Sequence, residues 1–182
     1  MMNLNNPVLI LIDVQKGFDD PSWGKRNNPE AEQNIEKLVN KWRTDNKPII
    51  YVQHMSDNPK SPLFPGQVGN EYKENVAPIG SEPLFHKNVH SAFIGTDLEE
   101  YLRSNNLDTL VITGITTNLC VATTARMAGN LGFKTYVVRD GTACFDTKDP
   151  DGELIPADLV HKVTLANLNG QFATIVKTSD LL

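Results

Sequence analysis

The chain has 182 residues, of which 40% are hydrophobic and 21% are charged, and its formal net charge is −5. This composition is typical of a compact globular protein and unlike that of a disordered one, so we expect one domain over residues 1–182. The acidic balance comes without a block of Lys or Arg, which argues against nucleic acid as a partner.

The sequence contains no apolar run near the ~20 residues that span a bilayer, and its first residues lack the basic patch and apolar core of a secretory signal. We therefore expect no membrane partner and a cytoplasmic protein. The two cysteines, Cys120 and Cys144, do not form a CxxC pair. In a reducing compartment they are predicted to be separate thiols, and we expect Cys144 to be a small buried residue without a catalytic role.

The first part of the chain predicts a βαβ unit. Residues 7–12 form a nearly continuous apolar run that ends at Asp13, as in a strand buried on both faces of a parallel sheet. Residues 29–46 predict a helix that Asn28 caps, and residues 48–52 predict the next strand.

Residues 56–83 are rich in Pro, Gly, Asn and Ser and predict a long loop, which is either a functional lid or a variable surface loop. The rest of the chain alternates between strands and helices. The predicted elements are a strand at 84–87, a helix to about 105 that opens with a capping box at 96–99, a strand at 109–114, a helix at about 118–131, a strand at 134–138, a helix at about 156–168 and a strand at about 173–176. This alternation predicts an α/β fold, namely a three-layer doubly wound sheet of about six strands, mainly parallel, with helices on both faces.

Three residues with chemical potential lie at predicted strand ends, where open α/β sheets bind ligands. Asp13 has apolar neighbours that favour its protonated form, so it can shuttle protons; alternatively it caps a turn. Cys120 falls in the first turn of a helix, which favours the thiolate; alternatively it is buried and inert. Lys87 can stabilise both charges; alternatively it is a solvated lysine.

Three segments resemble the isochorismatase-like cysteine hydrolases, which include isochorismatases, nicotinamidases and N-carbamoylsarcosine amidases. Residues 11–18 resemble the family's D-x-Q-x-x-F pattern, residues 87–93 are similar to its K-x-x-x-S-A-F pattern, and residues 113–126 resemble its nucleophile segment. The resemblance implies an enzyme in which Cys120 attacks the substrate, Asp13 moves protons and Lys87 stabilises charge.

The resemblance also implies a cis peptide bond between Ile115 and Thr116, with the N–H groups of Thr116 and Cys120 forming an oxyanion hole. Candidate substrate-pocket residues are Phe18, Trp23, His54 and Thr117, although the aromatic residues and His54 are also explained by packing. Nicotinamidases carry an Asp-x-His metal motif, but here the matching stretch is Gln53-His54-Met55-Ser56. We therefore expect no metal and no other cofactor, and nicotinamidase activity is disfavoured.

The implied reaction is cleavage of a C–N bond in a small amide or ureido compound through a thioester on Cys120. Two alternatives are vinyl ether hydrolysis of the isochorismatase type and a catalytically retired protein that binds small molecules or a partner. The family resemblance further suggests a homodimer or homotetramer.

Overall fold

The computed structural model describes residue 2 and residues 4–182. A six-stranded sheet with the order β3-β2-β1-β4-β5-β8 forms its centre, and every neighbouring pair is parallel. The strands are β1 (Pro7–Ile12), β2 (Ile49–His54), β3 (Leu84–Lys87), β4 (Thr109–Ile115), β5 (Lys134–Ala143) and β8 (Thr174–Val176). This order confirms the predicted α/β class.

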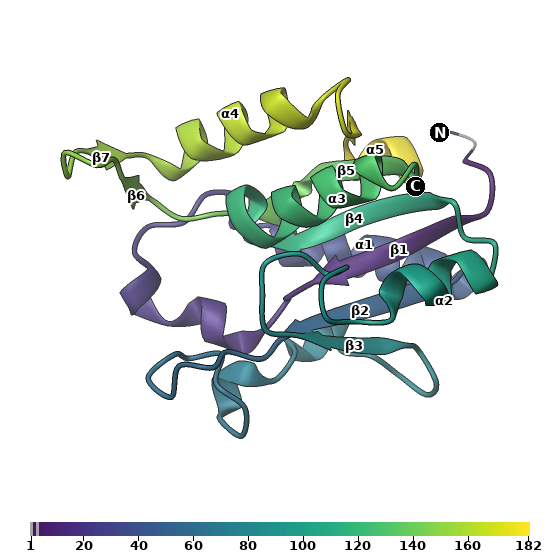
Figure 1. Cartoon of the computed structure of the whole chain (residues 1–182), viewed down its shortest axis with the longest axis horizontal. Coiled ribbons are helices and arrows are strands. Elements are labelled where there is room, and N and C mark those ends of the chain that lie inside the picture. The colour runs from purple at the N-terminus through teal and green to yellow at the C-terminus, as the bar shows by residue number, and fades with distance from the viewer. Residues whose placement is uncertain (1, 3) are drawn as a thin grey trace.

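Helices cover both faces of the sheet (Figure 1). One face packs against α1 (Ala31–Thr44) and α5 (Thr178–Leu181), and the other against α2 (Leu98–Ser104), α3 (Ala122–Asn130) and α4 (Ala157–Leu168). Successive residues of β1 enter the two cores alternately, and all except Pro7 are fully buried. A strand buried on both sides needs apolar residues at every position, which accounts for the continuous run.

The order in which strands are added to the sheet reverses between β1 and β4, because β2 and β3 are added on one side of β1 and β4, β5 and β8 on the other. At this point Gly114 of β4 faces Ile12 of β1. A Cβ atom on Gly114 would lie 2.0 Å from the Ile12 carbonyl oxygen, and its φ is +130°. Only glycine therefore allows the end of β4 to approach β1 this closely, which brings the segment after β4 next to the end of β1.

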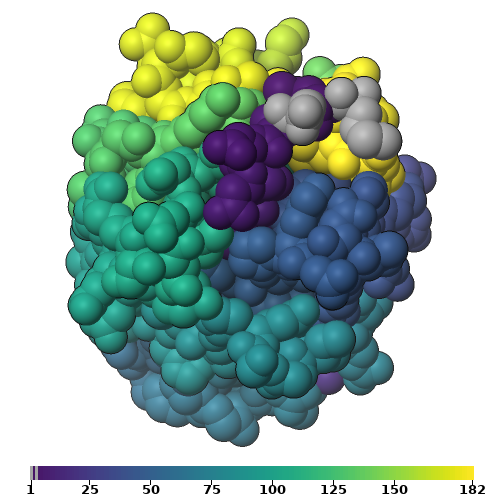
Figure 2. All heavy atoms as spheres, turned by 90° about the vertical axis from the view of Figure 1, so that its right-hand side faces the viewer, coloured from purple at the N-terminus to yellow at the C-terminus, as the bar shows by residue number. Residues whose placement is uncertain are grey.

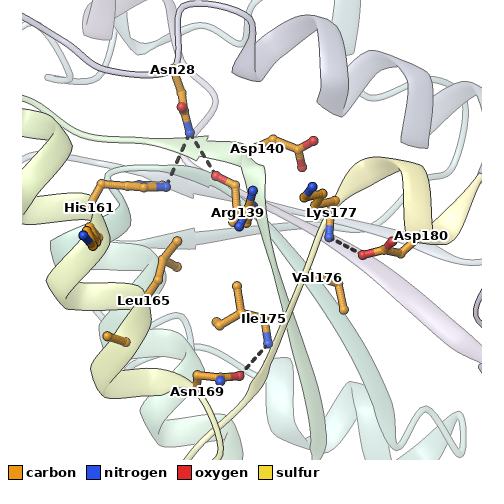
Figure 3. A pocket seen from close by; sticks show the side chains of 12 residues that line it. Asn28, Arg139, Asp140, His161, Leu165, Asn169, Ile175, Val176, Lys177 and Asp180 are labelled. Atoms are coloured by element: carbon orange, nitrogen blue, oxygen red, sulfur yellow. Dashed lines mark hydrogen bonds between the residues drawn. The ribbon is translucent and has the colours of Figure 1, made fainter.

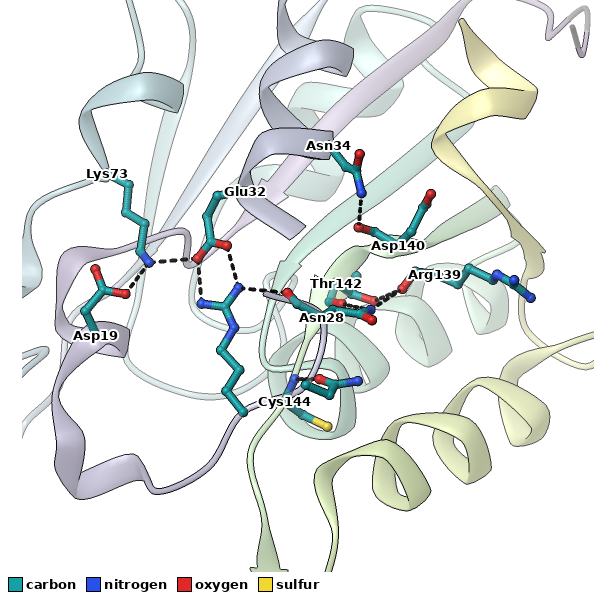
Figure 4. A network of polar contacts seen from close by, with 11 residues as sticks. Asp19, Asn28, Glu32, Asn34, Lys73, Arg139, Asp140, Thr142 and Cys144 are labelled. Atoms are coloured by element: carbon teal, nitrogen blue, oxygen red, sulfur yellow. Dashed lines mark hydrogen bonds and ion pairs between the residues drawn. The ribbon is translucent and has the colours of Figure 1, made fainter. Parts of the chain in front are cut away.

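The predicted capping of α1 by Asn28 is wrong. The N-cap residue is Glu30, which makes no side-chain cap hydrogen bond. The Asn28 amide instead donates to the carbonyl oxygens of Arg139 and Thr142 in β5, at 2.9 and 2.8 Å (Figure 4). The two bonds hold the Asn28 side chain against β5 and not at the start of α1, so Asn28 joins the loop before α1 to the sheet.

The capping box predicted at 96–99 is also not formed. Asp97 is the N-cap of α2 without a side-chain cap hydrogen bond, and Glu99 accepts from Arg103 at 2.8 Å. The Thr96 hydroxyl accepts from Leu98 N at 3.3 Å. The helix itself is present, because its apolar residues face the core.

Several elements were not predicted. Strand β5 continues to Ala143 because it resumes pairing with β4 after a register shift, although residues 139–143 carry no apolar run. A two-stranded hairpin follows, and it extends away from the sheet beside α4 (Figure 1). The remaining elements are β6 (Thr147–Lys148), β7 (Leu154–Ile155), a π-helical turn, η5 (Thr117–Val121), and the 3-10 turns η1 (Lys16–Asp19), η2 (Pro21–Trp23), η3 (Val68–Asn70) and η4 (Glu74–Val76).

The two chain ends lie together at the edge where the strands begin. Met2 N donates to the Asp180 carbonyl at 2.6 Å, and Figure 2 shows the purple N-terminal residues beside the yellow C-terminal ones. This face is opposite the strand ends that carry the candidate residues.

Among the helices of the part described, none has the length and hydropathy of a membrane span.

A charged cluster joins α1 to the loop between β1 and α1 and to the loop between β2 and β3 (Figure 4). Glu32 accepts hydrogen bonds from Arg26 and from Lys73, the latter at 2.7 Å. All three side chains are at most 16% exposed. Burial alone would raise the pKa of Glu32, but the hydrogen bonds from the two cations outweigh it and lower the pKa to about 2.

We expect Glu32→Gln to lower the free energy of unfolding at pH 7 by roughly 2–3 kcal/mol, because Arg26 loses its carboxylate partner and Lys73 keeps only the exposed Asp19. The folded-state pKa lies below the ordinary value of 4.5, so this stabilisation is present above pH 4.5 and is lost as the pH falls toward 2. Denaturant unfolding of both proteins should therefore show a difference that shrinks at about pH 3. Glu30→Gln, which changes an exposed carboxylate beside the same helix, should change stability by less than about 0.5 kcal/mol. An equal loss in both variants would contradict this account.

Candidate active site

Asp13 lies directly after β1, at the reversal of strand order. Its backbone is left-handed, with φ +52°, and its N–H donates to the Val52 carbonyl at 2.8 Å, so the chain stays attached to β2 while it turns. The carboxylate is fully buried, and Oδ2 accepts from Lys87 Nζ at 2.6 Å. Oδ1 has no hydrogen-bond partner among the described residues. A buried carboxylate oxygen without a partner is costly, which makes it a ready acceptor for a proton.

Lys87, the last residue of β3, brings the other predicted residues together. Its ammonium contacts Asp13 Oδ2, lies 3.2 Å from His54 Nδ1 and lies 3.4 Å from Cys120 Sγ. The Lys87 side chain is fully buried, so the solvated alternative does not hold. The ends of β1, β2, β3 and the segment after β4 thus converge on one ammonium group, as the strand-end rule predicts.

His54, at the end of β2, is neutral around pH 7. Burial, together with the positive charges of Lys87 and His90, lowers its pKa to about 4. An ammonium has only donors, so Nδ1 of His54 must accept from Lys87. The other ring nitrogen, Nε2, therefore carries the proton.

The donor atoms of Asp13, His54 and Cys120 lie within 4.8 Å of one another. A carboxylate, an imidazole and a thiol are ligand types that zinc accepts. The Lys87 ammonium, however, contacts all three of these residues. We therefore interpret the cluster as the surroundings of an ammonium group and not as a set of metal ligands.

Cys120 lies in the π-helical turn at 117–121 and is 6% exposed. Burial raises the pKa of its thiol well above the ordinary value, and the negative charge of Asp13 raises it further, while Lys87 acts in the opposite direction. The prediction that the thiolate is favoured is therefore wrong, because desolvation and the charge of Asp13 outweigh the effect of Lys87. The resting thiol is protonated, so its proton must leave during the attack.

Burial also raises the pKa of Asp13, and the charge and hydrogen bond of Lys87 only partly offset this effect. The carboxylate thus has a raised affinity for a proton and lies in the same cluster as the protonated thiol. This pairing suits transfer of a proton from sulfur to carboxylate.

The peptide bond between Ile115 and Thr116 is cis, as the family resemblance implies. The Thr116 carbonyl accepts from Leu119 N and Val121 N at 3.3 and 3.2 Å, so this oxygen is directed into the π turn that carries Cys120. The oxyanion role of the Thr116 and Cys120 N–H groups stays a prediction.

Gln15 is a site residue that sequence reasoning did not single out. Its Oε1 accepts from His54 N at 3.0 Å, and its Nε2 donates to the carbonyls of His54 and Asn70 at 3.1 and 2.8 Å. The fully buried amide therefore fixes the end of β2, and with it His54. The sequence feature that could have indicated Gln15 is its position two residues after Asp13. Asn70 belongs to the loop at 56–83, so this loop packs against the candidate site.

His90 is a second residue without a predicted role. Its Nδ1 lies 3.4 Å from Cys120 Sγ, and the residue is exposed. The sulfur thus contacts a buried ammonium and an exposed imidazole. His90 follows Lys87 by three residues, inside the segment that resembles K-x-x-x-S-A-F.

Two of the predicted pocket residues form an aromatic cluster. The ring centroids of Phe18 and Trp23 are 5.1 Å apart, and Phe145, which was not predicted, lies 6.2 and 5.6 Å from them. This cluster packs with Ile115, the residue before the cis bond, and with Leu63. An apolar surface therefore lies directly beside the nucleophile segment.

Thr117, the fourth predicted pocket residue, is fully buried, and its hydroxyl lies 2.9 Å from Nδ1 of His161 in α4. His161 also lines a cavity of about 740 Å³ between α4 and the ends of β5 and β8 (Figure 3). Thr117 therefore joins the nucleophile turn to α4. The triad residues do not line this cavity.

Cys144 is fully buried, with its sulfur 3.3 Å from the Ala157 carbonyl, as expected for a residue without a catalytic role.

Comparison with known proteins identifies the family. A family model described as the isochorismatase domain matches residues 7–180. The chain belongs to the isochorismatase family. The isochorismatase family protein YrdC of Bacillus subtilis is 48% identical over 174 residues, which cover 96% of this chain and 93% of that protein. A crystal structure of an isochorismatase-family protein from Chromobacterium violaceum has a TM-score of 0.94 and 44% identity, and the match covers 97% of this chain and 91% of that one.

N-carbamoylsarcosine amidase from an Arthrobacter species is 28% identical over 198 residues, which cover 98% of this chain and 70% of that protein. The present chain is an isochorismatase-family hydrolase that holds its own Asp13, Lys87 and Cys120 in the positions of a triad. The sequence resemblance and the geometry thus point to the same three residues.

Proposed function

We propose that this isochorismatase-family hydrolase cleaves a C–N bond of a small amide or ureido compound through a thioester on Cys120. The carrying observation is the buried cluster in which the Lys87 ammonium contacts both the Asp13 carboxylate and the Cys120 sulfur, while Asp13 Oδ1 lacks a partner. The likeness to N-carbamoylsarcosine amidase supports the choice of a C–N bond.

In the proposed first half-reaction, the thiol proton moves to Asp13 as the Cys120 sulfur bonds to the substrate's carbonyl carbon. The N–H groups of Thr116 and Cys120 stabilise the oxyanion that forms, as the family resemblance implies. The C–N bond then breaks, and the leaving nitrogen takes the proton from Asp13. Lys87 stays protonated and stabilises the negative charge, whether it lies on Asp13 or on the Cys120 sulfur.

The surroundings of the sulfur also favour a small substrate with a flat or apolar part. The aromatic cluster of Phe18, Trp23 and Phe145 packs against Ile115, and we assign it to the apolar side of the pocket. His54, with its proton on Nε2, is assigned as a hydrogen-bond donor to the substrate. Thr117 is not assigned a substrate contact, because its buried hydroxyl already contacts His161.

The test is a screen of primary amides, N-carbamoyl compounds and vinyl ethers against the purified protein. We expect ammonia release from at least one amide or carbamoyl compound, with the acid or amine product formed in equal amount. Hydrolysis of a vinyl ether alone, without ammonia from the other classes, would contradict the proposed bond.

A further inference from the structure

The Cys120 sulfur has a neighbour that the triad does not include. Nδ1 of His90 lies 3.4 Å from Sγ, the same separation as that between Sγ and Lys87 Nζ. Lys87 and Asp13 are buried, whereas His90 is exposed. A titratable group therefore contacts the reacting atom and is open to solvent.

Thioester hydrolysis requires a base for water, and the other groups around the sulfur are poorly suited to that task. The ammonium of Lys87 has no lone pair, and Nδ1 of His54 already accepts from that ammonium. Asp13 has one oxygen that can accept a proton, but its side chain is fully buried on the inner side of the cluster, whereas solvent water approaches from the exposed side. The imidazole of His90, on the solvent-facing side, has a ring nitrogen that can accept a proton from water and return it.

We propose that His90 is the general base that activates water for hydrolysis of the Cys120 thioester. This proposal rests on the proposed function. Asp13 is the base when the thioester forms, and His90 is the base when it is hydrolysed. The carbonyl carbon of the thioester is bonded to Sγ, so a ring nitrogen that contacts Sγ lies next to the reacting carbon.

The step balances as follows. The water oxygen bonds to the thioester carbon while one water proton moves to His90. The C–S bond then breaks, the sulfur recovers that proton from the imidazolium, and the carboxylic acid leaves. His90 returns to its neutral form and Cys120 to its thiol, with no net gain or loss of protons.

The Cys120 sulfur of the π turn contacts His90 directly. Behind that sulfur lie the titratable groups at the ends of β1, β2 and β3, namely Asp13, His54 and Lys87. The negative charge of Asp13 attracts a proton on His90, and the positive charge of Lys87 repels it. These two charges therefore act on a proton at His90 in opposite directions.

The proposal is tested with p-nitrophenyl acetate, an activated ester that acylates thiols and reports the first half-reaction by its coloured product. His90→Asn keeps a polar group at the position of Nδ1 but cannot exchange protons. We expect its burst of p-nitrophenolate to match that of the wild type, while steady-state hydrolysis falls at least about 10²-fold. Mass spectrometry should then show acetylated Cys120 accumulating in the variant.

The pH profile adds a readout that a merely structural role would not change. In the wild type, hydrolysis of the acetyl-enzyme should rise as the imidazole loses its proton, and this rise should be absent in His90→Asn. The control, His86→Asn, changes an exposed histidine of β3 and should behave like the wild type.

Wild-type steady-state hydrolysis in His90→Asn would overturn the proposal, and so would a slower burst without accumulation of acetyl-enzyme. The Cys120→Ala variant separates these outcomes from a failure of the proposed function. Ester hydrolysis that survives in Cys120→Ala overturns the thioester mechanism itself. Loss of hydrolysis in Cys120→Ala, together with normal deacylation in His90→Asn, overturns only the role of His90.

Discussion

Cys120→Ala is expected to lower kcat for the amide or ureido substrate by about 10⁵-fold, with the fold intact. The sulfur is the only atom of the cluster that the mechanism bonds to carbon, so the variant loses the covalent route altogether. The side chain is small and lies at the edge of the core, so its removal should lower the free energy of unfolding by only about 1 kcal/mol.

The measurement is steady-state release of ammonia by wild type and variant, with a denaturant titration of each protein. Cys144→Ala is the matched control, because the sulfur of this second buried cysteine contacts a backbone carbonyl of α4 and no residue of the triad. It should retain wild-type turnover. Turnover by Cys120→Ala within a few-fold of the wild type would rule out the cysteine mechanism.

Asp13→Asn is expected to lower kcat by about 10²–10⁴-fold and also to destabilise the protein. Asparagine has the same shape and tolerates the left-handed backbone at this position, so the change acts on charge and proton transfer. The variant leaves the buried Lys87 ammonium without its carboxylate, which costs about 3–5 kcal/mol of folding stability.

A double variant separates the two effects. Lys87→Met added to Asp13→Asn removes the unpaired charge, so most of the stability should return while the activity stays lost. Asp97→Asn, which changes an exposed carboxylate at the start of α2, should leave both quantities unchanged. If the double variant were no more stable than Asp13→Asn, the buried ion pair would not be the source of the loss.

The architecture was largely predictable, because strands buried on both faces leave continuous apolar runs such as residues 7–12. Helix ends were less predictable. Asn28 is a residue type that often caps helices, but its side-chain amide donates hydrogen bonds to carbonyls of β5. These are tertiary contacts across more than 100 residues. The continuation of β5 to Ala143 depends in the same way on pairing with β4 and not on its own composition.

The triad was predictable because three strand ends carry Asp13, Lys87 and the approach to Cys120, and because each falls in a segment resembling one family. The protonation of Cys120 was not predictable, since local sequence indicates a helix start but only the packed structure shows how deeply the thiol is desolvated. His90 was assigned no role for a related reason: an exposed histidine in a loop carries no periodic signal, and only the fold brings it to the sulfur.

The most direct test of the mechanism is mass spectrometry of the enzyme quenched with acid during turnover. The account predicts an acyl or carbamoyl group on the peptide that contains Cys120, which disappears once the substrate is exhausted and is absent from Cys120→Ala. Sustained release of ammonia with Cys120 unmodified at every time point would contradict it.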